Sequence, residues 1–130
     1  MIALLSNVTV ESLALRLKKA LGEEVITAPG FDAWRGELLN PASRIWADDV
    51  RTITILLHGP AFFPDGVDGR FEDILAEPLA ILAQAKATHK NKIFVVSTLD
   101  LPSSPALPLA GANFAARAAA FWREGLEAMN

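Results

Sequence analysis

The 130-residue chain has no cysteine, which excludes disulfide bonds, thiolate catalysis and cysteine-ligated zinc. It also lacks a surplus of positive charge, since 12 Lys and Arg residues stand against 15 Asp and Glu residues, for a formal net charge of −3. Binding of nucleic-acid phosphates needs a concentrated basic surface, whereas these basic residues are scattered. We therefore expect no nucleic-acid partner.

No apolar run approaches the ~20 residues that span a membrane, so we expect no membrane partner. The apolar N-terminal run is too short for a signal peptide and has no basic region before it, which predicts a cytoplasmic protein. The fingerprints G-x-G-x-x-G and the P-loop are both missing, and we expect no cofactor and no metal. A hydrophobic content of 52% predicts a core-forming chain, with residues 1–130 as a single domain.

The pattern along the chain alternates strands and helices. The apolar runs that indicate strands do not alternate with polar residues, which is typical of strands buried on both faces: 2–5, 24–27, 52–57 and 93–97. Helices are predicted between and after them, at about 10–21, 33–39, 71–88 and 113–129. We expect Asn7 or Thr9 to cap the first helix, Gly22 to end it, Asp32 to cap the second, and Pro78 to kink or divide the third.

This order predicts an α/β fold with a parallel sheet and helices on both faces, a three-layer flavodoxin- or SGNH-like architecture. Right-handed crossovers give the strand order 2-1-3-4. Ligands of such sheets bind beyond the carboxyl ends of the strands, where the strand order reverses. The candidate site residues at that edge are Ser6, Asn7, His58, Gly59, Thr98 and Asp100, and two Pro- and Gly-rich loops, 59–70 and 99–111, lie next to it.

Ser6 has two interpretations. As a nucleophile, its hydroxyl would attack a carbonyl while amides at the start of the first helix stabilise the oxyanion. Alternatively, Ser6 and Asn7 only satisfy the unpaired amides of that helix. His58 is likewise either the base for Ser6 or a donor to a substrate, or a strand-end histidine bonded to a loop carbonyl. Asp65 and Asp68 resemble half of a calcium loop, but paired Asp-Gly turns explain them better.

Two segments carry a family resemblance. L-S-N before the first helix, and the stretch A-P-x-F-x-x-W that runs on to N-P-x-S at residues 40–43, resemble the N-terminal domain of FkbH-like proteins. In that family an SGNH-hydrolase-like domain precedes a phosphatase domain of the haloacid-dehalogenase type. The resemblance covers residues 2–60 and implies a role near glyceryl transfer to acyl carrier proteins in polyketide or related biosynthesis.

The chain departs from the SGNH pattern where catalysis is concerned. Ser6 stands at the family's serine position, but Leu4-Leu5-Ser6 replaces G-D-S, and no Asn-Asp follows His58-Gly59. A D-x-x-H motif occurs nowhere in the 130 residues. The final strand and helix of the full fold are also expected to be missing.

Two classes of function follow. The first is an accessory or binding module, not catalytic alone, whose partner is an acyl carrier protein or an adjacent phosphatase domain; the basic residues of the first helix (Arg16, Lys18, Lys19) would bind an acidic carrier. The second is a serine esterase or acyltransferase that uses Ser6 with His58 and has Asp100 as the orienting acid. The fourth strand would be an exposed apolar edge, which predicts a homodimer or a fragment of a longer chain.

Overall fold

The computed structural model describes residues 1–30, 32–101 and 108–130, with side chains from residue 113 onward in the last segment. Its centre is a parallel sheet of β1 (Ile2–Ser6), β2 (Val25–Thr27), β3 (Thr52–Leu56) and β4 (Ile93–Val96) in the order β2-β1-β3-β4. The α/β fold and the strand order predicted from the sequence are thereby confirmed. The described residues form two compact units, one of residues 1–57 and 84–97 and the other of residues 58–83 and 98–130.

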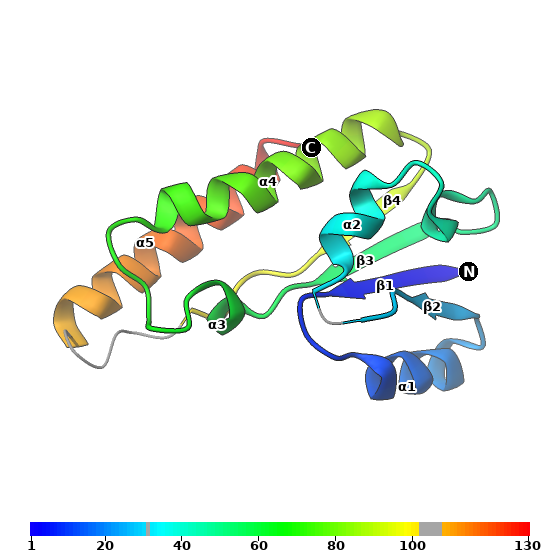
Figure 1. The fold of residues 1–130 in the computed structure, drawn as a ribbon, viewed down its shortest axis with the longest axis horizontal. Coiled ribbons are helices and arrows are strands. Elements are labelled where there is room, and N and C mark those ends of the chain that lie inside the picture. The colour runs from blue at the N-terminus through cyan, green and yellow to red at the C-terminus, as the bar shows by residue number, and fades with distance from the viewer. Residues whose placement is uncertain (31, 102–107) are drawn as a thin grey trace. The chain divides into compact units, whose positions relative to one another are not determined.

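The first unit contains the whole sheet. β1 and β3 pair over their full lengths, from Ile2 with Thr52 to Ser6 with Leu56. Their central residues are fully buried because helical segments on both faces exclude water: Leu4, Leu5, Ile53 and Ile55. Helices α1 (Glu11–Leu21) and α2 (Trp34–Leu39) lie on opposite faces of this sheet (Figure 1), as right-handed crossovers to the two neighbours of β1 require.

Helix α1 differs from its prediction at its start. Its N-cap residue is Val10, which makes no side-chain cap hydrogen bond, so the predicted caps Asn7 and Thr9 were wrong. The predicted end is confirmed, since Gly22 adopts the left-handed conformation at φ 68° and its N–H donates to the carbonyl of Lys18.

The segment before β3 is held by its own polar side chains. Asp32, the predicted cap of α2, does not cap it; its carboxylate accepts from the Trp34 indole and the Arg35 guanidinium, both at 2.8 Å. Asn40 Oδ1 accepts from the amide of Ala42 at 3.0 Å, and Ser43 Oγ caps a short 3-10 helix, Arg44–Trp46, by accepting from the amide of Ile45. These contacts give Trp34, Asn40 and Ser43 of the A-P-x-F-x-x-W and N-P-x-S stretches a structural role, while Phe31 lies outside the described residues.

A buried lysine joins this segment to β4. Lys92 is 8% exposed, and its Nζ donates to the carbonyls of Ala47 at 2.6 Å and Val50 at 2.7 Å. The ammonium thus satisfies carbonyls of the connection that leads into β3, while the next residue begins β4. A second contact in the same region stacks the rings of His89 and Trp46 at 3.7 Å. Burial, and to a lesser degree the charge of Lys92, lowers the pKa of His89.

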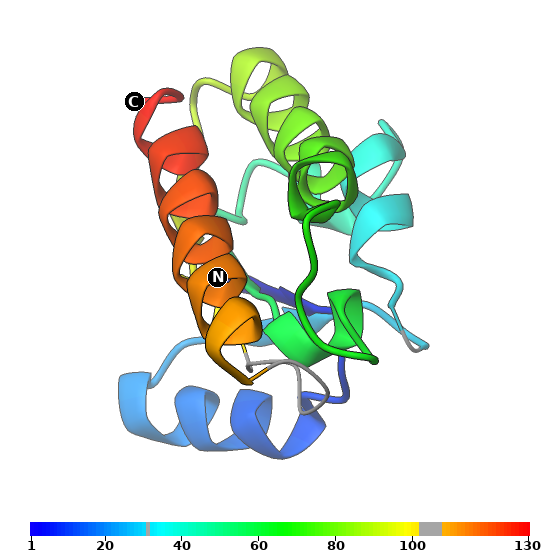
Figure 2. The same ribbon diagram turned by 90° about the vertical axis from the view of Figure 1, so that its left-hand side faces the viewer.

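The second unit is built from α3 (Gly59–Phe62), the first part of α4 (Phe71–Thr88) and α5 (Pro108–Glu127). The first part of α4 and α5 run side by side and parallel (Figures 1 and 2), with Phe71 against Phe121 and Leu79 against Gly125. Helix α4 has the predicted bounds and continues through the buried Pro78, so it is not divided.

Both predicted loops contain helix. Helix α3 occupies the start of 59–70, and α5 begins at Pro108, inside the predicted loop 99–111 and five residues before its predicted start; residues 102–107 of that loop lie outside the described residues.

The two hydrogen bonds that Lys92 donates should contribute measurably to the stability of the fold. We expect Lys92→Met, which keeps most of the apolar stem, to lower the free energy of unfolding by about 2 kcal/mol, because two buried carbonyls lose a charged donor. Urea unfolding followed by tryptophan fluorescence measures this. The matched control is Lys90→Met on the neighbouring exposed lysine, and equal effects of the two variants would contradict the prediction.

Candidate functional site

Ser6 and Asn7 lie where the sequence predicted, at the carboxyl end of β1, beside which the strand order reverses. Both are buried, with 7% of Ser6 and 2% of Asn7 exposed. Ser6 Oγ accepts a hydrogen bond from the amide of Val8 at 3.2 Å. This short turn lets the chain leave the strand and enter α1, so Ser6 has a structural role that does not depend on a catalytic partner.

His58, Gly59, Thr98 and Asp100 belong to the second unit, whereas Ser6 and Asn7 belong to the first. The exposed His58 is the N-cap residue of α3, but its side chain makes no cap hydrogen bond. Thr98 and Asp100 are also exposed. The pairing of Ser6 with His58, and of His58 with Asp100, stays a prediction.

Within the second unit, the backbone at Gly59 lies directly against the backbone at Asp100. A Cβ atom on Gly59 would lie 2.1 Å from the carbonyl oxygen of Asp100 and 2.8 Å from a methyl of Leu101. Only glycine fits this contact, because a backbone oxygen cannot move aside as the tip of a flexible side chain can. The predicted residues Gly59 and Asp100 are therefore brought together, by their main chains.

A residue that the sequence analysis left out of the site joins the ends of two strands. Ser97 follows β4, and its Oγ accepts from the amide of Leu57, which follows β3, at 3.0 Å. The Ser97 amide in turn donates to the carbonyl of Ile55 at 3.0 Å. Ser97 extends the pairing of β3 and β4 past their last paired residues. The signal was present in the sequence as a serine directly after the apolar run IFVV.

Asp68 of the Asp-Gly segment behaves as a turn residue. Asp68 accepts from the amide of Arg70 at 2.9 Å and forms an ion pair with its guanidinium at 2.9 Å. Both hydrogen bonds from Arg70 lower the pKa of Asp68, and the bond from the guanidinium has the larger effect. Among the residues that the structure describes, no three histidine, aspartate or glutamate side chains group as a metal site would require.

Helix α1 presents a surface that the core does not use. Ala14 is its single buried residue, and three of its leucines are exposed, by 38% for Leu13, 70% for Leu15 and 55% for Leu21. The helix packs against β2, a strand of only three half-buried residues, and this strand is too short to cover the apolar residues of an 11-residue helix. Leucine side chains left in water on one helix indicate a contact surface.

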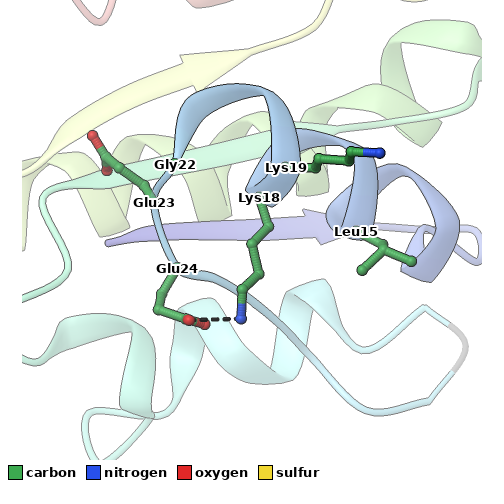
Figure 3. A pocket seen from close by; sticks show the side chains of 6 residues that line it. All are labelled: Leu15, Lys18, Lys19, Gly22, Glu23 and Glu24. Carbon is green, nitrogen blue, oxygen red and sulfur yellow. Dashed lines mark ion pairs between the residues drawn. The ribbon is translucent and has the colours of Figure 1, made fainter.

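A shallow depression of about 450 Å³ lies at the C-terminal end of this helix, lined by Leu15, Lys18, Lys19, Gly22, Glu23 and Glu24. Figure 3 shows Lys18 directed toward Glu24, with which it forms an ion pair at 2.6 Å, while Lys19 points away from that carboxylate. Leu15 thus stands beside two lysines, three and four residues further along the helix. We call Leu15, Arg16, Lys18, Lys19 and Leu21 the α1 surface.

Comparisons with known proteins assign no family. No family model, no curated protein and no solved structure matches this chain significantly. Over the described parts of the chain, no helix is both long and apolar enough to cross a membrane. The class of protein that the structure defines is an α/β protein with a parallel four-stranded sheet.

The main-chain contact at Gly59 is open to a direct test. We expect Gly59→Ala to destabilise the protein by about 1–3 kcal/mol, because the added methyl group meets a backbone oxygen. Urea unfolding gives the change. In Gly36→Ala, the control inside α2, the new methyl meets nothing within 4 Å, so that variant should be neutral or more stable by about 0.5–1 kcal/mol. A neutral Gly59→Ala variant would contradict the contact.

Proposed function

We propose that this protein is an accessory binding module, not catalytic alone, that docks an acidic acyl carrier protein through the α1 surface. The single observation that carries the proposal is Leu15, 70% exposed on α1 beside Lys18 and Lys19. An apolar side chain with two lysines one turn further along the helix suits a partner that offers an apolar contact within an acidic surface. The resemblance of residues 2–60 to the N-terminal domain of FkbH-like proteins supports a carrier protein as that partner.

The charge distribution of the chain supports docking at this place. The net charge of −3 repels an acidic partner from the molecule as a whole. Three cations lie within four residues on α1 (Arg16, Lys18, Lys19), and one of them is partly neutralised by Glu24. Local attraction at α1 would therefore set the orientation of the carrier protein, and the exposed leucines would supply the contact area. An adjacent phosphatase domain is the other partner that the resemblance implies.

Docking can be measured by titrating a purified acyl carrier protein of a polyketide synthase into the ¹⁵N-labelled chain. We expect shifted amide resonances confined to α1 and a dissociation constant raised about tenfold or more by Leu15→Asp or Lys19→Glu. Leu39→Asp is the matched control, because Leu39 is also an exposed leucine, 51% accessible, but lies on α2. Shifts away from α1, or equal effects of Leu15→Asp and Leu39→Asp, would contradict the proposal.

A serine esterase or acyltransferase is the second candidate, and the position of Ser6 and Asn7 at the carboxyl end of β1 favours it. In that mechanism His58 would take the proton of Ser6 while the hydroxyl oxygen attacks the carbonyl carbon, and Asp100 would orient the histidine. The low exposure of Ser6 and its bond to the Val8 amide count for the accessory module instead.

A fluorophosphonate probe separates the two functions. We expect no covalent labelling of the wild-type chain, because Ser6 Oγ is buried in a turn at the start of the helix connection. Mass spectrometry detects the adduct, and Ser6→Ala and His58→Gln serve as controls. If the wild type is labelled and both variants abolish the labelling, the proposal of a non-catalytic binding module is wrong and the serine hydrolase is supported.

A further inference from the structure

β4 is an edge strand with an open side. It pairs with β3, and among the described residues no strand pairs with its other side. The amides of Ile93 and Ser97 donate to carbonyls of Arg51 and Ile55, each at 3.0 Å. Since successive residues of a strand direct their backbone groups to opposite sides, the N–H and C=O groups of Phe94 and Val96 point to the open edge.

This edge has little protection against pairing, because Lys92, the charged residue directly before β4, is buried, and the exposed Lys90 lies outside the strand. β4 contains neither a charge nor a proline, and its side chains Ile93 and Val95 are 61% and 48% exposed. The opposite edge of the sheet, β2, is preceded by Glu23 and Glu24 and followed by Pro29. Charges and prolines are the devices that keep edge strands from joining other chains. The β2 edge is therefore better protected than the β4 edge against pairing with another strand.

We propose that β4 pairs antiparallel with β4 of a second copy of this chain, about a two-fold axis at Val95. In this register Phe94 of each copy faces Val96 of the other, and each such pair exchanges both backbone N–H···O bonds. Val95 then faces the Val95 of the second copy in the closely spaced pair without hydrogen bonds. The outward groups are self-complementary in this register, because the residues with open N–H and C=O groups lie symmetrically about Val95.

Two further observations favour a second copy over another strand. Because β4 has no charged residue, pairing two copies of it brings no like charges together. The two Val95 side chains at the axis would also cover each other. The pairing between the two copies would also end before Lys92, because the amide of Lys92 already donates to the carbonyl of His89. The paired segment is short, so the dimer should depend on concentration. This inference goes beyond the proposed docking, since it uses no residue of α1.

A single introduced cysteine tests the register, since the chain has no other. Val95→Cys places two Cα atoms about 4.5 Å apart, within the range that a disulfide bridges. Ile93→Cys is the matched control on the same face; a rise of about 3.3 Å per residue would put its two copies roughly 13 Å apart. We expect Val95→Cys at about 10 μM protein to cross-link about 100-fold faster than Ile93→Cys, because pairing raises the effective concentration of the two thiols to about millimolar. Equal rates would overturn the proposal.

Charge exchange at the axis provides a second test that needs no cross-link. Val95→Lys and Val95→Glu each put like charges face to face, so sedimentation velocity should show each variant as a monomer where the wild type dimerises. A mixture of the two should recover the dimer, because the facing charges are then opposite. Circular dichroism checks that each variant is folded, and the half-exposed position of Val95 favours this. A wild type that stays monomeric at millimolar concentration, or a mixture that stays dissociated, would overturn the proposal.

Discussion

The parallel pairing of β1 with β3 is the constraint on which the rest of the first unit depends. It buries the apolar runs of both strands and places Ser6 level with Leu56 at one edge of the sheet. Because β1 has β2 on its other side, the chain must cross over both faces, and α1 and α2 lie on opposite faces as a result. Ser97 extends the pairing of β3 with β4 past the ends of both strands, because its hydroxyl accepts from the amide of Leu57.

The sheet has only four strands, so both edge strands lie close to the core, and the two edges differ in what they leave exposed. At the β2 edge the strand is short and preceded by two glutamates, while the helix packed on it keeps exposed leucines. At the β4 edge the backbone itself is open and the side chains are apolar. Apolar area left in water is costly at roughly 25 cal/mol per Å², so surfaces of this kind usually have a use.

The fold could be predicted well from the sequence, because strands buried on both faces of a parallel sheet consist of unbroken apolar runs. TITIL and IFVV could be located to within a residue, and the helix from Phe71 to Thr88 was found with its bounds. Local polar chemistry was predicted less well. Asp32 resembled a helix cap, but the indole of Trp34 and the guanidinium of Arg35 bind its carboxylate, and a competition of this kind depends on tertiary position.

The candidate site was predictable only in outline. The rule that ligands bind beyond the carboxyl ends of parallel strands selected Ser6 and Asn7, and both lie there. Helical periodicity, however, cannot tell a leucine that a sheet covers from one that it leaves exposed. Leu13, Leu17 and Leu21 recur at a spacing typical of a core face, whereas the short β2 covers only part of that face. The exposed remainder became visible only when the length of the neighbouring strand was known.

The two contact surfaces are compatible because they lie at opposite edges of the sheet. The α1 surface is on the helix that packs against β2, and the proposed dimer uses β4, with β1 and β3 between the two edge strands. A carrier protein bound at α1 would therefore leave the β4 edge open. A two-fold dimer would then present two α1 surfaces, and a partner with several carrier domains could engage both. Avidity of this kind would let the small α1 surface hold the proposed carrier protein more tightly than a single contact could.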